Sequence, residues 1–104
     1  MHELVISAVA FKEGDSWVVQ GIEYDIAAHA NDPSDLPKAL CRALAENFCI
    51  TQALGRQPME GVKPAPARFR ELFDKARTTL GSVTSLNSPI PVGAMNIRLA
   101  HAEH

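Results

Sequence analysis

The clearest pattern of hydrophobic positions in the chain is a helical one near its middle. Apolar and small side chains recur there at steps of three and four, so they share one stripe of a helix: Leu36, Leu40, Ala43, Leu44, Phe48, Thr51 and Leu54. Asp32 or Ser34 can accept hydrogen bonds from the first free backbone N–H groups, and Pro37 is tolerated only in a first turn. Gly55 ends the pattern. We therefore expect a long helix over 33–54 whose stripe is covered by a sheet.

Three short apolar stretches precede this helix. Residues 3–11 are β-branched and apolar at both odd and even positions, which suits a strand with a helix on one face and partial cover on the other. Residues 12–16 predict a hairpin turn, and a second strand follows over 17–22, where Gly21 marks a bulge or a close backbone approach. Residues 26–30 predict a third short strand. Sequential strands followed by a helix predict an antiparallel meander with the helix across it.

The second half of the chain contains a shorter helical pattern. Three prolines and a glycine make 56–66 a loop. Residues 67–80 then predict a helix, with Gly81 as its cap and one apolar face formed by Phe69, Leu72, Phe73, Ala76 and Leu80. A linker rich in serine and proline is expected over 82–91, and alternation over 92–100 predicts a half-buried fourth strand.

These elements predict one α+β domain over residues 1–104. Its sheet is a three-stranded antiparallel meander plus a C-terminal strand, covered by one long helix and a second shorter helix. A chain of 104 residues with 46% hydrophobic residues is large enough for a single core.

The net charge of −2 gives no global field that would attract nucleic acid or anionic lipid. The distribution is less even than this sum. Residues 1–62 carry nine acidic and four basic side chains, a net charge of −5, whereas residues 63–104 carry six basic and three acidic ones, a net charge of +3. The second half of the chain could therefore form a basic patch.

The lack of a recognisable targeting signal and the spacing of the two cysteines indicate a cytoplasmic protein. The first residues lack a basic leader, and no stretch approaches the roughly 20 apolar residues of a membrane span. Cys41 and Cys49 lie eight residues apart on the expected helix, which separates them by about 12 Å along its axis, beyond disulfide reach. Both are expected to be reduced thiols with a structural role.

The outer face of the helix predicted over 67–80 is the candidate for nucleic-acid contact. Its basic residues are Arg68, Arg70, Lys75 and Arg77. Glu71 and Asp74 are interleaved with them at helical spacing, which also suits a solvated surface whose charges pair with one another. Both interpretations remain open from the sequence.

The sequence predicts no catalytic, cofactor-binding or metal-ligating residue. Glycine-rich phosphate loops, nucleophile elbows and paired-cysteine metal motifs are all absent. Glu23, Asp25 and Glu46 could in principle converge on two metal ions, as a metal-dependent nuclease requires. However, two of these acids flank a turn, where acids are common, and Glu46 lies off the apolar stripe. His101 and His104 have metal-like spacing, but they lie in a polar tail with no further ligand besides an acid.

The first half of the chain resembles the HicB-like antitoxin family. The similarity is carried by EGDSWVV (13–19), GIEYDIAAHAND (21–32) and the helix SDLPKALCRALAENF (34–48). The resemblance implies a degenerate ribonuclease-H-like sheet of three strands, a helix across it and a later strand near the end. In this family the partial fold lacks nuclease activity and binds a small HicA-type ribonuclease toxin, usually as a dimer or larger assembly. The helix predicted over 67–80 is an insertion relative to that pattern.

The sequence therefore favours a noncatalytic HicB-like binding protein without a cofactor. Its expected partners are a HicA-type toxin and further copies of itself. No association with a membrane is expected. The alternatives are a nucleic-acid-binding module that uses the basic helix face and, less favoured, a metal-dependent nuclease.

Overall fold

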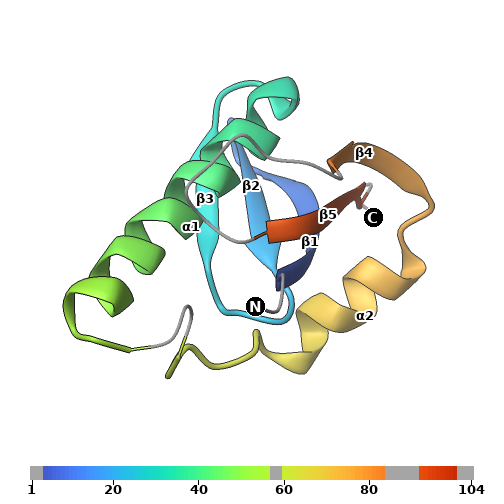
Figure 1. Cartoon of the computed structure of the whole chain (residues 1–104). Helices are drawn as coiled ribbons and strands as arrows, with labels where there is room; N and C mark the ends of the chain where they lie inside the picture. Colours follow the sequence, from blue (N-terminus) through green and yellow to red (C-terminus); the bar gives the residue numbers. More distant parts are fainter. Residues whose placement is uncertain (1–3, 57–59, 84–91, 101–104) are drawn as a thin grey trace.

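The computed structural model describes residues 4–56, 60–83 and 92–100, and it shows an α+β fold (Figure 1). The elements in chain order are β1 (Leu4–Glu13), β2 (Ser16–Gly21), β3 (Ala27–Ala30), the short 3₁₀ helix η1 (Pro33–Asp35), α1 (Leu36–Ala53), α2 (Ala67–Lys75), β4 (Thr78–Val83) and β5 (Val92–Leu99). The strands form one open mixed sheet in the order β3-β2-β1-β5-β4. None of the described helices is both long and apolar enough to cross a membrane.

The predicted meander is confirmed. β1 pairs antiparallel with β2, and β2 pairs antiparallel with β3. Gly14 has a φ of 63°, which suits the tight turn between Glu13 and Ser16. The C-terminal strand β5 joins the sheet beside β1 and runs parallel to it.

The long helix begins and ends where local chemistry places it. The Asp32 carboxylate caps η1 by accepting a hydrogen bond from the Ser34 N–H at 2.9 Å, and α1 follows η1 directly, with Pro37 in its first turn. At the other end Gly55 adopts a φ of 73°, and its N–H donates to the Gln52 carbonyl. The predicted helix over 33–54 is therefore accounted for by η1 and α1 together.

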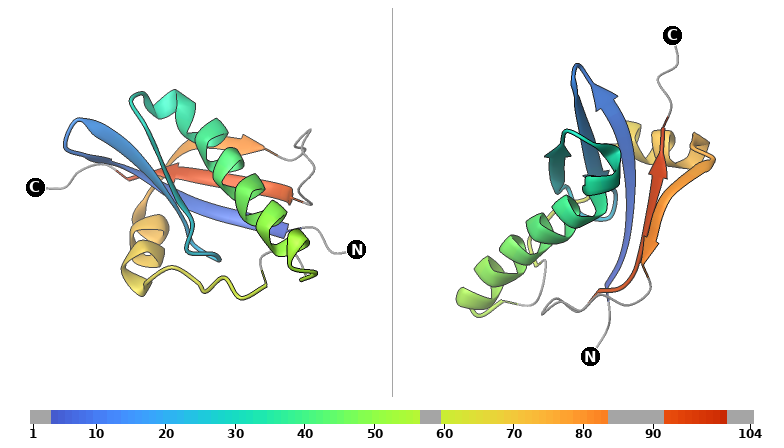
Figure 2. Two further views of the ribbon diagram at one scale, coloured as in Figure 1. Left: turned by 90° about the vertical axis from the view of Figure 1, so that its left-hand side faces the viewer. Right: turned by 90° about the horizontal axis from the view of Figure 1, so that it is seen from above.

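One face of the sheet is covered by α1, and this layer holds most of the core (Figure 2). The buried cluster is aliphatic apart from one methionine and consists of Ile6, Ala8, Ala10, Val19, Ile26, Ala28, Leu36, Leu40, Leu44, Met95 and Ile97. Leu54, which the helical stripe predicts to be covered, is instead 62% exposed. Figure 2 shows the reason, because the C-terminal end of α1 leans away from the sheet.

The opposite face of the sheet is covered in part by α2. Val9 and Phe11 alternate with the β1 residues that face α1, so they point to this second side. Val9, Ile22 and Phe73 form its buried cluster, against which Phe69 packs. The two helices therefore lie on opposite faces of the sheet, as the right-hand view of Figure 2 shows.

The prediction of a helix over 67–80 is wrong at its C-terminal end. α2 ends at Lys75, and Ala76 is already extended, with φ −72° and ψ 132°. Residues 78–83 form β4, which pairs antiparallel with β5, so Gly81 lies in a strand and caps no helix. Two adjacent β-branched threonines favour a strand here, and pairing with β5 satisfies backbone groups that the edge of the sheet would otherwise expose. Of the linker predicted over 82–91, the part from 84 onward lies outside the described residues.

Gly21 marks a close approach of two backbone segments, as predicted. A Cβ atom added at this residue would lie 2.7 Å from the Tyr24 carbonyl oxygen and 3.2 Å from that of Ile26. Both neighbours are backbone atoms, which cannot move aside without shifting the chain. The tight turn after β2 therefore requires glycine at this position.

The loop between α1 and α2 carries the chain from one face of the sheet to the other. The Asp25 N–H donates to the Lys63 carbonyl at 2.7 Å, and the Ala65 N–H donates to the Ile22 carbonyl at 3.0 Å. Val62, in the same loop, packs against the α1 cluster. These contacts fix the point at which α2 begins on the second face.

Candidate functional site

The short helix α2 presents two different faces. Phe69 and Phe73 pack toward the sheet. Arg68, Leu72 and Lys75 follow one another at steps of four and three, so they share a second face that does not point at the core. This second face borders a hollow between α2 and β1.

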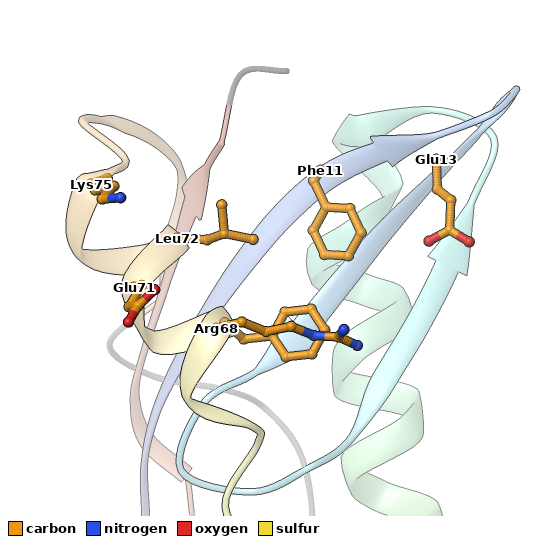
Figure 3. A pocket seen from close by; sticks show the side chains of 7 residues that line it. Phe11, Glu13, Arg68, Glu71, Leu72 and Lys75 are labelled. Carbon is orange, nitrogen blue, oxygen red and sulfur yellow. The ribbon is translucent and has the colours of Figure 1, made fainter. Parts of the chain in front are cut away.

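We call this space the α2 hollow. It lies between α2 and the end of β1, has a volume of about 480 Å³, and is lined by Phe11, Glu13, Arg68, Phe69, Glu71, Leu72 and Lys75. Figure 3 shows Phe11 from β1 and Leu72 from α2 entering the same space between these two elements. The rings of Phe11 and Phe69 stack with centroids 6.0 Å apart and planes inclined by 20°, and Leu72 is 38% exposed. The floor of the hollow is therefore apolar and open to solvent.

The rim of the α2 hollow carries charges of both signs. The Arg68 guanidinium lies 4.7 Å from the centroid of the Phe69 ring, a cation–π distance, and extends across the hollow in Figure 3. Glu13 reaches the rim from β1, whereas Glu71 and Lys75 reach it from α2, one turn apart. Two acids and two bases surround the apolar floor, so the hollow has no strong preference for a polyanion.

A smaller hollow of about 290 Å³ adjoins the first. Leu72 and Lys75 line both spaces, and Arg77 lines only the smaller one, together with Thr78 and Leu99. The polypeptide leaves α2 at this point and turns into β4. The two hollows together give the α2 side a continuous recessed surface.

The structure separates the four basic residues proposed for nucleic-acid contact. Arg68, Lys75 and Arg77 line the two hollows. Arg70 is exposed but lines neither of them, because a step of two residues rotates it by about 200° from Arg68 around the helix. The basic face expected from the sequence is thus divided between two sides of α2.

Arg98, on β5, holds α2 in place through contacts with Phe73 that the sequence did not reveal. Its guanidinium donates a hydrogen bond to the Phe73 carbonyl at 3.0 Å and lies 4.1 Å from the centroid of the Phe73 ring. A cation near the C-terminal end of a helix also interacts favourably with the helix dipole. The only sequence signal was alternation on β5, which placed Arg98 on the side opposite Met95 and Ile97. Through these contacts Arg98 joins α2 to β5.

Two of the three carboxylates considered for metal binding, Glu23 and Asp25, are engaged in structural hydrogen bonds. Glu23 accepts from the Ser7 N–H at 2.6 Å, while the Ser7 carbonyl accepts from the Ile22 N–H at 2.8 Å. Asp25 accepts from the buried Gln20 amide at 2.8 Å, and Glu46 is exposed on α1. Among the described residues, no group of three or more histidine, cysteine, aspartate or glutamate side chains could hold a metal ion. His101 and His104 lie outside the described residues.

Both cysteines are free thiols on α1, as their spacing predicts. Cys41 is half-buried against the core, and this burial raises the pKa of its thiol. Cys49 is exposed. The raised pKa reduces the thiolate fraction of Cys41, which suits a packing residue better than a nucleophile.

Comparison of the chain with protein-family models, with curated proteins and with solved structures finds no match. The geometry of the molecule itself is therefore the basis for a functional assignment. The α2 hollow is the feature that most clearly offers a binding surface.

Proposed function

We propose that the chain is a noncatalytic HicB-like binding protein, an antitoxin that binds and neutralises a small HicA-type ribonuclease toxin. The observation that carries the proposal is the α2 hollow. An apolar floor surrounded by charges of both signs is typical of protein–protein interfaces, where a central hydrophobic anchor is enclosed by a polar rim. The α2 hollow is therefore the proposed toxin-binding surface.

Its chemistry favours a polypeptide partner. The stacked Phe11 and Phe69 rings and the exposed part of Leu72 can receive an apolar side chain. Glu13 and Glu71 can pair with basic residues around that anchor, and Arg68 and Lys75 with acidic ones. A small basic toxin can satisfy the two acids while an apolar residue fills the floor.

The HicB-like part of the proposal is supported by the order of the elements. The meander of β1, β2 and β3 is followed by a long helix across it and by β5 near the end of the chain. These are the features that the sequence resemblance implies. α2 and β4 lie before β5 as an insertion, and this insertion builds the α2 hollow.

The noncatalytic part is supported by the roles of the acidic residues. Glu23 holds the Ser7 amide, and Asp25 holds the Gln20 amide. Each carboxylate thus already satisfies a polar group within the fold. Glu46 lies exposed on α1.

Copurification from the cells that naturally make the protein tests this proposal. We expect the untagged wild-type chain to bring down a short basic protein encoded next to it. Leu72→Arg should remove the capture, because it places a charge on the apolar floor of the α2 hollow. Leu54→Arg is the matched control at an exposed leucine directly after α1 and should retain the capture. Absence of such a protein, or equal capture by both variants, would contradict the proposal.

The family resemblance also implies self-association. We expect sedimentation velocity of the purified chain to show a dimer or larger assembly in the absence of a partner. A monomer at all accessible concentrations would remove this part of the proposal.

A nucleic-acid-binding module is the second candidate. It is favoured by Arg68, Lys75 and Arg77, which line adjacent hollows on the α2 side. With about three phosphate contacts, the logarithm of the binding constant should fall with the logarithm of salt concentration with a slope of about −2 to −3. Reversal of Arg68 and Arg77 to glutamate should abolish RNA or DNA binding in this case. Salt-independent binding would exclude it.

A further inference from the structure

β3 forms an open edge of the sheet. It pairs with β2 on one side only. The loop between α1 and α2 contacts the segment just before β3, where the Lys63 carbonyl accepts a hydrogen bond from the Asp25 N–H. Among the described residues, no strand pairs with the outer side of Ala27–Ala30. An edge of this kind exposes unpaired backbone N–H and C=O groups.

The pairing pattern identifies which groups point outward. The Gly21 N–H donates to the Ile26 carbonyl at 2.8 Å, one step beyond the Gln20–Ala27 pair. Hydrogen-bonded and non-hydrogen-bonded pairs alternate along an antiparallel ladder. Ala27 and His29 therefore belong to non-hydrogen-bonded pairs, and their N–H and C=O groups point away from β2. Together they offer two donors and two acceptors to an incoming strand.

A separate hollow accompanies this edge. It has a volume of about 290 Å³ and lies between β3 and the N-terminal half of α1, lined by His29, Ala30, Asp35, Lys38, Ala39 and Arg42. Lys38 and Arg42 are exposed and lie one turn apart on α1, so both can reach the same ligand. The single acid on the rim, Asp35, is outnumbered by these two permanent cations. The hollow therefore favours an anionic side chain.

We propose that β3 binds an acidic, extended polypeptide segment, which adds a strand to the sheet and places a glutamate or aspartate side chain beside Lys38 and Arg42. Backbone hydrogen bonds to Ala27 and His29 would hold the segment, and the hollow would select its charge. This surface is built by β3 and α1, apart from the α2 hollow. The inference does not depend on the proposed antitoxin function.

The charges at the edge argue for a foreign segment over a second copy of this chain. Antiparallel pairing of two β3 strands through their outward groups sets Ala27 of one copy opposite His29 of the other. Ala27–Ala30 contains no acidic side chain, so a second copy of this strand brings no carboxylate to Lys38 and Arg42. An acidic segment of another protein supplies one.

A labelled peptide tests the charge selection. The probe is a short fluorescein-labelled peptide that alternates glutamate and valine between threonine ends, and the matched control carries lysine in place of each glutamate. Fluorescence anisotropy at low salt should show saturable binding of the glutamate peptide and at least about tenfold weaker binding of the lysine peptide. Equal affinities, or no binding of the glutamate peptide, would overturn the proposal.

Two variants of the full chain locate the site. Lys38→Glu combined with Arg42→Glu should weaken binding of the glutamate peptide at least about tenfold, because both residues are exposed and the change reverses the charge of the hollow. Arg56→Glu combined with Arg70→Glu makes the same change of charge at two exposed positions that line neither this hollow nor the α2 hollow, and should leave binding unaffected. If this control pair weakens binding as strongly as the α1 pair, the proposed location is wrong.

The strand-addition step has its own test. His29→Pro removes an outward N–H without breaking a bond to β2, and proline is tolerated on edge strands. It should abolish peptide binding while the circular dichroism spectrum remains that of the wild type. Because this variant could unfold, a glutamate peptide with alternate backbone amides N-methylated provides a second measurement on the unchanged protein and should also fail to bind. Undiminished binding of the methylated peptide would overturn the proposal. If the wild-type chain self-associates and His29→Pro abolishes that self-association, the β3 edge binds a second copy of the chain and the proposal is also overturned.

Discussion

The two faces of the sheet are built differently. Among the described residues, the α1 face buries a cluster of eleven side chains, all aliphatic apart from Met95. The α2 face buries Val9, Ile22 and Phe73, and adds half-buried rings, charged residues and an open hollow. The first face is closed by an 18-residue helix, the second by one of nine residues.

The difference in burial between the two faces suggests that the α1 face mainly stabilises the fold, whereas the α2 face is available for binding. Free energy from hydrophobic burial scales with the apolar area removed from water, so the α1 face contributes most of the stability. The α2 face leaves apolar floor and charged rim accessible, so its side chains can be changed with less effect on the fold.

The largest effect is expected in the α1 core. Leu44 is 1% exposed, and Leu44→Ala should lower the free energy of unfolding by about 3 kcal/mol through lost burial and a residual cavity. Leu54→Ala, directly after the same helix and at a 62% exposed position, should change it by less than about 0.5 kcal/mol. Urea denaturation measures both. Equal losses would show that the two ends of α1 are equally packed.

A larger side chain on the α2 face should matter less. Phe69 is half-buried, so Phe69→Ala should cost about 1–2 kcal/mol despite removing more atoms than Leu44→Ala. Thermal unfolding of both variants, followed by circular dichroism, gives the comparison. If Phe69→Ala is the more destabilising of the two, the α2 face is part of the main core.

The attachment of α2 to β5 should be weaker still. Arg98→Met retains much of the apolar stem but removes the hydrogen bond to the Phe73 carbonyl and the contact with its ring, at a cost of about 1 kcal/mol. Arg70→Met, at an exposed position on α2, is the control and should stay within about 0.5 kcal/mol of the wild type. Hydrogen exchange of the α2 amides should report the loosened attachment. Unchanged exchange in Arg98→Met would show that this contact does not hold the helix.

The cap of η1, the short helix that leads into α1, should give a small, pH-dependent effect. Hydrogen bonds from the Ser34 side chain and then its backbone N–H lower the pKa of the exposed Asp32 carboxyl from 3.8. A carboxyl with a lower pKa in the folded state stabilises the fold above its unfolded pKa, and this contribution disappears as pH falls through the folded value. Asp32→Ala should therefore be slightly less stable than the wild type at neutral pH, and the difference should shrink as the pH falls from 3.8 through the lowered pKa of Asp32. A constant difference across that range would exclude the carboxylate as its cause.

Thiol labelling compares the two halves of α1 without changing stability. Burial raises the pKa of Cys41, so less of it is thiolate at a given pH, and the half-buried side chain is also less accessible. Iodoacetamide should modify the exposed Cys49 several-fold faster, as measured by mass spectrometry of peptides. Equal rates would indicate that α1 separates from the sheet on the labelling timescale.

Local patterns in the sequence were sufficient for most of the elements. The stripe through Leu36, Leu40 and Leu44 defines α1 because period and burial are linked along one helix. Turn chemistry defines the hairpin at Gly14 for a similarly local reason. β4 was missed because residues 76–80 continue a helical spacing of apolar positions, and only pairing with β5 makes them a strand.

Local sequence patterns predicted less of the candidate site than of the fold. The sequence indicated Arg68, Lys75 and Arg77 as basic residues near one helix, and the structure places them at two adjacent hollows. It gave no sign that Phe11 and Glu13 would join them, because these residues lie more than fifty positions earlier in the chain. Long-range contacts of this kind leave no periodic trace in either segment.

The sequence by itself determined the α+β class, the meander, the long helix and the absence of a disulfide between Cys41 and Cys49, since each depends on neighbouring residues within one or two elements. The tertiary structure alone decided that β5 lies parallel beside β1, that the two helices cover opposite faces, and that β3 and β4 are the edges. Those choices depend on how separate elements bury their apolar sides and satisfy their backbone groups together, and these are requirements of the assembled sheet.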